Sequence, residues 1–280
     1  MNKLAFLGPI GSYTNEAAIN YNKNLELINC NSIPQVIEKV RTGLADEGIL
    51  PIENSIEGPV TSTIDLLIQE PKLKIKTETV IAIKHCLLIK EPTELENIQY
   101  VYSHPQALSQ CRNFLSSNLP KAKLIASLST SNAVEEMKKS KVTSAAIANH
   151  KCASIYNVQI IATKISDNEN NYTRFIVLSN IDNKQTGKDK TSICFDFPHD
   201  SPGILYMVLE KFAKRHINLT KIESRPSKTN LGNYIFLIDL EGHKDDEIIN
   251  ECFNEIKPLI SMFKIFGSYP IFNMSNISKN

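Results

Sequence analysis

Short apolar runs alternate with amphipathic stretches in the first fifth of the chain. Strand-like runs lie at 3–7, 25–29 and 48–51, with helical periodicity at 14–21 and from Ser32 to Thr42. This order predicts a βαβαβ unit. Ser32 followed by Gln35 is typical of a helix start, Pro34 suits the first turn, and Gly43 suits a helix end.

The same rhythm returns after residue 99. Strands are expected at 99–103, 123–127 and 144–148, with helices at 105–119 and 132–139. The β-rich passage 73–89 and the extended runs 159–164 and 172–178 should cross between the two units as a hinge. We therefore expect two α/β lobes, the first at about 1–75 and 165–180 and the second at about 76–164.

A third unit follows a polar stretch without periodicity. Residues 181–190 are expected to be a linker that ends a first domain at 1–180. Beyond it, the pattern predicts strands at 192–197, 218–224, 233–240 and 261–268, with helices at 203–215 and 245–256. The order βαββαβ is that of a ferredoxin-like domain, expected to span 191–280.

Composition narrows the function. Of the 280 residues, 42% are hydrophobic and 22% charged, and the net charge of +1 gives no reason to expect a nucleic-acid partner. No apolar run is long enough for a membrane span, and Leu4–Leu7 is too short for an export signal, so a cytoplasmic location is expected. The six cysteines are dispersed without CxxC spacing, and we expect neither a metal nor a cofactor. A small-molecule ligand fits best.

Polar loops should meet between the two lobes. Parallel α/β sheets bind ligands at the carboxyl ends of their strands, where loops lead into helices. The loops expected at this cleft are 8–14, 52–58, 103–106, 129–132 and 168–173. All are rich in hydroxyl, amide or glycine groups.

Two of these loops offer anion or amide chemistry. In GPIGSYTNEAA at 8–18, Gly8 and Gly11 let backbone amides approach an anion, although a tight turn capped by Thr14 remains an alternative. The loop lacks nucleotide-binding spacings. PIENSIEGPV at 51–60 places Asn54 after an apolar strand, where it either binds a ligand or, with Ser55, caps a helix.

Two further segments carry hydroxyl and amide side chains. In SHPQALSQC at 103–111, Ser103 is expected near a helix N-cap and Gln110 about two turns later on the same face, with His104 an acid or base or a cap. In NNYTRFIVL at 170–178, Thr173 and Arg174 should point to opposite faces of a strand, so one of them enters the cleft. Thr173 alone would usually be only a β-former.

Together and in this order, these four segments resemble the successive signatures of the prephenate dehydratase family. INLTKIESRP at 217–226 and the run 232–236 resemble the ACT regulatory domain of phenylalanine-responsive enzymes. The resemblance covers nearly the whole chain. It implies a two-lobed periplasmic-binding-protein-like catalytic domain followed by an ACT domain, conversion of prephenate to phenylpyruvate with loss of CO2 and water, and no cofactor.

The resemblance also implies roles for residues. The catalytic positions would be Thr173, Asn54, Ser103 and Gln110. The substrate-binding positions would be Ser12, Thr14, Glu53, Arg174 and Phe175. The effector-binding positions for L-phenylalanine would be Gly203, Leu205, Glu223, Ser224, Arg225 and Pro226. Ser12 and Thr14 stand in the opposite order to many relatives, and Ile204 replaces a common alanine, which bears on how tightly phenylalanine binds.

Assembly and substrate remain open between alternatives. An isolated ferredoxin-like sheet leaves open edges, so a homodimer or homotetramer is expected. The chain begins directly with the first strand, so a monofunctional enzyme without a chorismate mutase domain is expected. The alternatives are arogenate dehydratase, whose substrate bears an amine instead of the ketone, and a non-catalytic two-lobed sensor. A purely structural interaction protein has less support.

Overall fold

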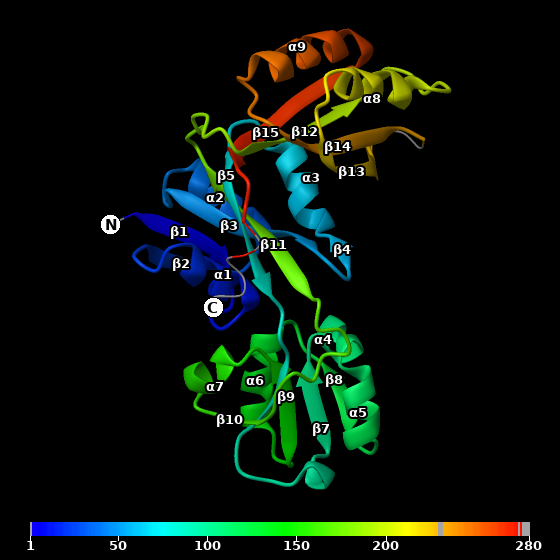
Figure 1. The fold of residues 1–280 in the computed structure, drawn as a ribbon. Helices are drawn as coiled ribbons and strands as arrows, with labels where there is room; N and C mark the ends of the chain where they lie inside the picture. The colour runs from blue at the N-terminus through cyan, green and yellow to red at the C-terminus, as the bar shows by residue number, and fades with distance from the viewer. Residues whose placement is uncertain (1, 229–231, 274, 276–280) are drawn as a thin grey trace.

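Three β-sheets follow one another along the long axis of the molecule (Figure 1). The structure is a computed structural model that describes residues 2–228, 232–273 and 275. The C-terminal domain lies at one end, the first lobe in the middle and the second lobe at the other end. This arrangement confirms the expected fold class of two α/β lobes followed by a ferredoxin-like domain.

The first lobe is built on a sheet of order β2-β1-β3-β11-β5, with β4 beside β3. Its strands are β1 (Lys3–Leu7), β2 (Glu26–Cys30), β3 (Glu47–Asn54), β4 (Gly58–Pro59), β5 (Lys74–Ala82) and β11 (Tyr172–Ser179). Its helices are α1 (Tyr13–Tyr21), α2 (Ile33–Arg41) and α3 (Thr61–Gln69). The βαβαβ prediction is confirmed. Because β5 pairs with β11, this lobe extends beyond the expected limit near residue 75.

Helix α2 shows why this segment folds as the sequence indicates. The Ser32 side chain accepts a hydrogen bond from the Gln35 N–H, which satisfies one first-turn donor. The Gln35 side chain accepts from the Asn31 N–H. Val36 and Val40 face the core, and Gly43 follows the helix with φ of +74°. The predicted start and end of this helix are confirmed.

The second lobe has a sheet of order β10-β6-β9-β7-β8. Its strands are β6 (Cys86–Ile89), β7 (Tyr100–Ser103), β8 (Lys123–Ala126), β9 (Ser144–Ala148) and β10 (Gln159–Ala162). Its helices are η1 (Leu95–Asn97), α4 (Pro105–Gln110), α5 (Arg112–Asn118), α6 (Thr130–Lys139) and α7 (Lys151–Tyr156). The single helix expected at 105–119 is therefore wrong: it breaks at Cys111, whose φ of −117° and ψ of 20° are not helical.

The chain crosses between the lobes twice, after β5 and before β11, as expected for a hinge. The two crossings lie side by side, because the Ile83 N–H donates to the Asn171 carbonyl over 2.8 Å. Residues that flank both crossings therefore reach the space between the lobes.

The C-terminal domain is an antiparallel sheet of order β13-β14-β12-β15. Its elements are β12 (Asp189–Asp196), α8 (Ile204–Lys214), β13 (Leu219–Pro226), β14 (Tyr234–Glu241), α9 (Glu247–Ile256), η2 (Lys257–Leu259) and β15 (Met262–Pro270). The βαββαβ prediction is confirmed. Strand β12 begins inside the expected linker 181–190, and the Asn183 side chain donates to the carbonyls of Lys76 and Ser268, so the linker is tied to both domains.

The C-terminal domain packs its sheet on the first lobe. Helices α8 and α9 cover the outer face, and the other face is turned toward α3 and β5 (Figure 1). Leu237 and Phe266 of this face belong to the same buried cluster as Ile64 and Ile75 of the first lobe. Within the part of the chain that is described, no helix has the length and apolarity needed to cross a membrane.

Candidate active site

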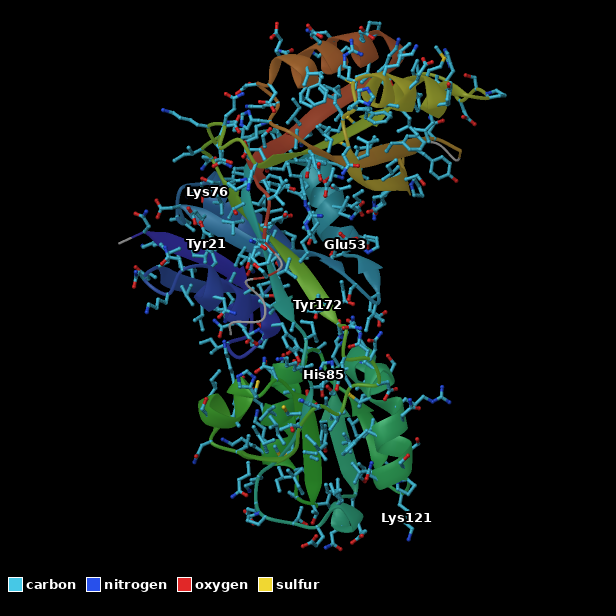
Figure 2. The ribbon with its side chains drawn as sticks, viewed as in Figure 1. Tyr21, Glu53, Lys76, His85, Lys121 and Tyr172 are labelled. Carbon is cyan, nitrogen blue, oxygen red and sulfur yellow. The ribbon has the colours of Figure 1, made fainter. Side chains whose placement is uncertain are left out.

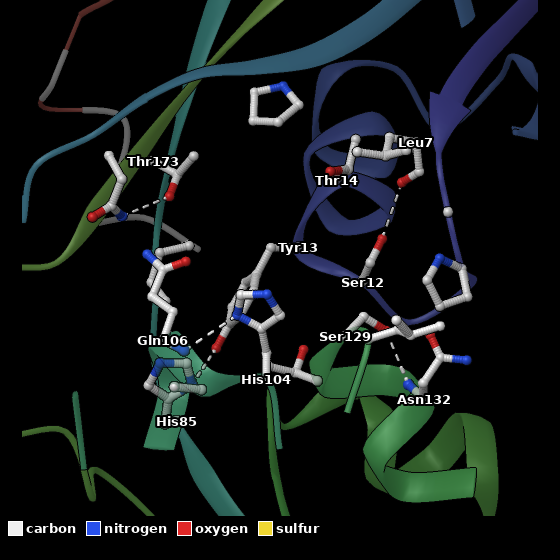
Figure 3. A pocket seen from close by; sticks show the side chains of 18 of the residues that line it. Leu7, Ser12, Tyr13, Thr14, His85, His104, Gln106, Ser129, Asn132 and Thr173 are labelled. Atoms are coloured by element: carbon white, nitrogen blue, oxygen red, sulfur yellow. Dashed lines mark hydrogen bonds between the residues drawn. The ribbon is translucent and has the colours of Figure 1, made fainter. Parts of the chain in front are cut away.

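A cavity of about 620 Å³ lies between the two lobes (Figure 3). Its walls come from both lobes and from the crossing segments. The lining residues most relevant to chemistry are Ser12, Tyr13, Thr14, Asn54, His85, His104, Gln106, Gln110, Ser129, Asn132, Thr173 and Phe175. The described residues that line the cavity include no Asp, Glu, Lys or Arg. A ligand here meets hydroxyl, amide, imidazole and backbone groups.

Thr173 and Asn54 form a cross-strand pair at the cavity. Thr173 of β11 lies opposite Asn54 of β3, and the Asn54 Nδ2 donates to the Thr173 Oγ1 over 2.9 Å. Because the hydroxyl oxygen accepts this bond, its own proton is left for another acceptor. Both residues are buried and line the cavity, so the proton is available to a group that enters the cavity.

The orientation of the Asn54 amide is fixed by its backbone contacts. Its Oδ1 accepts from the N–H groups of Ile56 and Glu57, each over 3.0 Å, so the other end must be the Nδ2 donor. Besides Thr173, this Nδ2 contacts the Asn171 Oδ1 at 2.8 Å. Asn54 is therefore held as a donor toward Thr173.

The amides continue as an oriented chain across the two lobes. The Asn171 Nδ2 donates to the Gln110 Oε1 over 2.9 Å, and the Gln110 Nε2 donates to the Glu57 Oε1 over 3.1 Å. Each amide thus uses its oxygen on one neighbour and its nitrogen on the next. Gln110, in the second lobe, is linked through Asn171 to the Asn54–Thr173 pair in the first lobe.

His85 joins this chain from the crossing segment. Its Nε2 lies 3.1 Å from the Gln110 Oε1, and an amide oxygen only accepts, so Nε2 carries the proton. Burial lowers the pKa of His85, which favours the neutral ring, while the bond to Gln110 opposes this shift. The Nδ1 then lies 3.0 Å from the Tyr13 hydroxyl. Burial raises the pKa of Tyr13, so the phenol stays protonated.

Helices α1 and α6 begin at the cavity wall. Ser12 caps α1 by accepting from the Asn15 N–H, and Ser129 caps α6 by accepting from the Asn132 N–H. The first-turn N–H groups of a helix lack intrahelical partners and carry partial positive charge. Two such ends offer anion-binding groups to a cavity that has no lysine or arginine in its described lining.

The glycine loop before α1 is shaped by close contacts. A Cβ on Gly8 would lie 1.7 Å from the Asn29 Oδ1, and Gly11 has φ of +84°. The second lobe holds the loop: the Asn149 Nδ2 donates to the Gly11 carbonyl over 2.7 Å. Ser12, not Thr14, is the cap of α1, so the alternative reading of Thr14 as a cap is wrong, and Thr14 lines the cavity.

Three expected site residues lie away from the cavity. Ser103 is the last residue of β7, fully buried, and donates to the Ile147 carbonyl over 2.7 Å. The helix cap is His104, which accepts from the Gln106 N–H, so the expectation that Ser103 and Gln110 share a helical face is wrong. Glu53 and Arg174 point to the opposite face of the sheet and contact the C-terminal domain.

The structure adds residues that the motifs did not single out. Tyr13 lies between Ser12 and Thr14, and Asn171 lies two residues before Thr173, so their position in the quoted segments was a usable signal. Gln106 lies in the 103–111 segment and lines the cavity. His85 and Asn132 lie outside those segments. Asn132 belongs to the loop 129–132 that was expected at the cleft, whereas His85 is brought to the cavity only by the fold.

The expected effector residues occupy two parts of the C-terminal domain. Gly203 precedes α8 with φ of +85°, and Leu205 packs on the core of the domain. Glu223 and Arg225, in β13, form ion pairs, and Arg225 reaches Asp65 of α3 at 2.6 Å. Ser224 and Pro226 are exposed on the same strand. Among the described residues, no group of three His, Cys, Asp or Glu is arranged to hold a metal.

Comparison with known proteins places the chain in a family. The prephenate dehydratase family model matches residues 4–183, and the ACT domain model matches residues 198–257. The chain is 42% identical to a bifunctional chorismate mutase/prephenate dehydratase of Aquifex aeolicus, covering 96% of this chain and 73% of that protein. It is 39% identical to a prephenate dehydratase of Methanocaldococcus jannaschii, covering 98% and 100% of the two chains.

Solved structures agree with the sequence comparison. The crystal structure of prephenate dehydratase from Arthrobacter aurescens in complex with L-Phe superposes with a TM-score of 0.89 at 32% identity, covering 99% of this chain and 91% of that one. The interlobe cavity, with its paired Thr173 and Asn54, is therefore found on the fold of that enzyme. The chain belongs to the prephenate dehydratase family and carries an ACT domain after its catalytic region.

Proposed function

We propose that the interlobe cavity converts prephenate to phenylpyruvate, CO2 and water, with Thr173 and Asn54 acting on the leaving hydroxyl. The observation that carries the proposal is the Thr173 hydroxyl, which accepts from Asn54 and faces an uncharged cavity at two helix N-termini. Gln110 and Asn171 extend this hydrogen-bonded group, and Ser103 supports the strand before His104 from within the sheet.

Substrate binding follows from the two carboxylates of prephenate. The N-termini of α1 and α6, with Ser12, Thr14 and Asn132 nearby, offer backbone and hydroxyl donors for anions. A charge-assisted hydrogen bond contributes on the order of 1.5 to 3 kcal/mol. Phe175 adds an apolar surface for the ring. Arg174 and Glu53 are left out of this binding role because their side chains lie on the other face of the sheet.

The chemical step breaks two bonds of the ring. The electron pair of the bond to the ring carboxylate stays with the ring as CO2 leaves, and the C–O bond on the opposite carbon breaks as hydroxide departs. One proton is taken up to make water, and aromatisation supplies the driving force. The Thr173 O–H donates a hydrogen bond that strengthens as charge develops on the departing oxygen, which is the kind of stabilisation that speeds the step.

The lining of the cavity favours prephenate over arogenate. The amine of arogenate is a cation, and a buried cation is best held by a partner with negative charge. The nearby Glu57 carboxylate accepts from the Gln110 Nε2 and is outside the described lining of the cavity. A ketone needs no such partner, so it suits these walls better.

The proposal also covers regulation by L-phenylalanine and the assembly of subunits. We infer that L-phenylalanine binds the C-terminal domain through Gly203, Leu205 and residues 223–226 at a contact between subunits, and lowers activity. Among the described strands, β13 lies at the edge of its sheet and pairs on one side only, which suits pairing in a homodimer or homotetramer. The catalytic unit would end near residue 180. Six buried free thiols suit the reducing cytoplasm.

One experiment tests the activity. The purified protein is incubated with prephenate or arogenate, with and without L-phenylalanine, while phenylpyruvate and phenylalanine are measured. Phenylpyruvate from prephenate, with less of it when L-phenylalanine is present, supports the proposal. Phenylalanine formed faster from arogenate would favour the amine substrate. Saturable binding of prephenate without any product would favour a non-catalytic sensor.

A further inference from the structure

The residue pair Thr173–Asn54 is followed in the same strand ladder by a second pair, and each such pair is called a rung here. In the β11–β3 ladder, Thr173 lies opposite Asn54 and Arg174 lies opposite Glu53. Successive side chains of a strand point to opposite faces, so the first rung faces the cavity and the second faces the C-terminal domain. Figure 2 places Glu53 on the side of the first lobe near that domain, far from His85 at the junction of the lobes.

Arg174 is held by residues of both domains. Its Nε donates to the Glu78 Oε2 over 2.6 Å within the first lobe. Its Nη1 donates to the Asp239 Oδ2 over 2.8 Å and its Nη2 to the Tyr269 hydroxyl over 2.9 Å, both in the C-terminal domain. All three guanidinium nitrogens are thus used, and the planar group fixes the direction of the side chain.

The partners of Arg174 are buried, so the loss of one charge would leave another without compensation. Burial lowers the pKa of Arg174, but Tyr269, Asp239 and Glu78 raise it above its usual value overall. Burial raises the pKa of Asp239, yet Arg174 and the Ser192 hydroxyl hold it below its usual value. Each charge therefore depends on the other, because a buried charge without its partner is destabilising.

Glu53, the other half of the second rung, is contacted by a lysine of the C-terminal domain. The Lys221 Nζ lies 3.2 Å from the Glu53 Oε2 and 3.2 Å from the Glu223 Oε2. Glu223 in turn lies 3.6 Å from Arg225. Charged contacts therefore run without interruption from the rung behind the catalytic pair to the strand segment 223–226.

The ladder beside these rungs is irregular. Arg174 lies opposite Glu53, but Phe175 lies opposite Pro51, so Ile52 is an extra residue in β3. A bulge of this kind re-aims neighbouring side chains and weakens the pairing that would otherwise fix them. The direction of the Thr173 and Asn54 side chains then depends more on what holds Arg174 and Glu53 from behind.

We propose that Asp239 and Lys221 of the C-terminal domain are positioning residues for the dehydratase reaction, acting through Arg174 and Glu53 on Thr173 and Asn54. This positioning role rests on the dehydratase function proposed above. The C-terminal domain thereby completes the support of the catalytic pair in every molecule, with or without an effector. A change at residues 223–226 reaches the same support through Lys221.

Two variants and a matched control test this role. Asp239→Asn keeps the size but removes the charge that binds Arg174, and Lys221→Met keeps the stem but removes the contact to Glu53. The control is Lys264→Met, which removes hydrogen bonds from β15 to the carbonyls of Leu67 and Ile68 at the same domain interface. In the contacts described, Lys264 touches neither Arg174 nor Glu53. Lys264→Met therefore weakens the interface between the domains without disturbing the support of the catalytic pair.

Steady-state kinetics and amide hydrogen exchange are the measurements. For Asp239→Asn and Lys221→Met, kcat is expected to fall about 10- to 100-fold with the KM for prephenate changed less than about 3-fold, because small displacements of a reacting group are costly. Exchange should become faster at 51–55 and 172–175. Lys264→Met should keep kcat and the exchange of these segments.

The outcomes separate this proposal from the activity itself. Equal behaviour of all three variants, in kinetics and in exchange, would overturn the positioning role. If the unaltered protein made no phenylpyruvate while exchange at 51–55 and 172–175 still responded only to Asp239→Asn and Lys221→Met, the proposed activity would fall and the support of the pair by the C-terminal domain would stand.

Discussion

The Asn54 side-chain amide donates to the Thr173 hydroxyl over 2.9 Å at the wall of the interlobe cavity. The donor end of Asn54 is set by two backbone N–H groups at its oxygen, so the direction of this bond is not free to reverse. A hydroxyl that accepts on one side donates on the other. The pair is therefore built to offer one hydrogen-bond donor to a ligand, and its consequences can be measured.

Removing the Thr173 hydroxyl should lower turnover without unfolding the protein. Thr173→Ala is expected to reduce kcat about 10²- to 10³-fold, by analogy with loss of a single oxyanion-hole donor. Thr173→Ser keeps the hydroxyl and should retain most of the rate. Near-native kcat for the alanine variant, measured by phenylpyruvate formation, would show that this hydroxyl has no part in the reaction.

Replacing Asn54 by aspartate should reverse the polarity of the pair. Asn54→Asp has the same size, but the carboxylate accepts where the amide donated, so it would draw the Thr173 proton away from the ligand. We expect kcat at neutral pH to fall about as far as in Thr173→Ala. The double variant should then lose little more than either single one, because the two residues act together. Independent, multiplying losses would argue against a shared role.

His85 should make the protein less stable in mild acid. Its folded pKa is lowered from 6.5 by burial, so below about pH 6.5 the unfolded chain binds a proton that the folded chain does not. The free energy of unfolding should therefore fall as the pH drops from 6.5 toward the folded pKa. His85→Gln, which keeps a donor near Gln110, should show a smaller fall in urea titrations at pH 7.5 and 5.5.

His104 provides a second test of the pH dependence of stability described for His85. Its pKa is also lowered by burial, while Glu57 opposes the shift, so His104→Gln should act in the same direction. An unchanged pH dependence in both variants would mean that neither ring is kept neutral by the fold.

Asn149 should matter for substrate binding through the glycine loop. Its side chain donates to the Gly11 carbonyl and accepts from the Cys152 N–H, and Asn149 is 1% exposed. Asn149→Ala is expected to lower the free energy of unfolding by about 1 to 3 kcal/mol and to raise the KM for prephenate. His150→Ala, at the exposed neighbouring position, is the control and should change neither. An unchanged KM would separate the loop from substrate binding.

Ile204 should limit the binding of phenylalanine. It is the first residue of α8, next to Gly203. It is larger than the alanine that the resemblance to phenylalanine-responsive ACT domains implies at this position. Ile204→Ala is expected to lower the Kd for L-phenylalanine in calorimetry, with Ile248→Ala on α9 as the control. An unchanged Kd in Ile204→Ala would place the effector elsewhere, and weaker binding would show that the isoleucine itself makes a favourable contact.

The alternation of strands and helices was predictable because burial imposes it. Strand β9 is buried along its whole length, and α2 combines a serine cap with a buried apolar face. Helix α3 was missed because Val60 precedes it without a side-chain cap. The break at Cys111 involves neither glycine nor proline, so nothing local marked it.

The sequence predicted the site residues where a short segment was enough to place them. Asn54, Gln110 and Thr173 do meet through hydrogen bonds. Ser103 was placed by counting helical turns, but it ends a strand, so the spacing did not apply. Alternation along β11 correctly put Thr173 and Arg174 on opposite faces, but only the packing of the third domain shows what Arg174 binds.

The two helix ends at an uncharged cavity also bear on how product leaves. Prephenate arrives with two carboxylates, and one of them leaves as neutral CO2 while its electron pair passes through the ring to the departing hydroxide, which takes up a proton to become water. A helix end that holds the lost carboxylate, as proposed above, would then face nothing that it attracts strongly, whereas a lysine or arginine would continue to attract the remaining anion over a longer distance. In that arrangement, the step that breaks the bonds also lowers the affinity of the cavity for the ligand. Phenylpyruvate would therefore bind less tightly than prephenate, which favours its release.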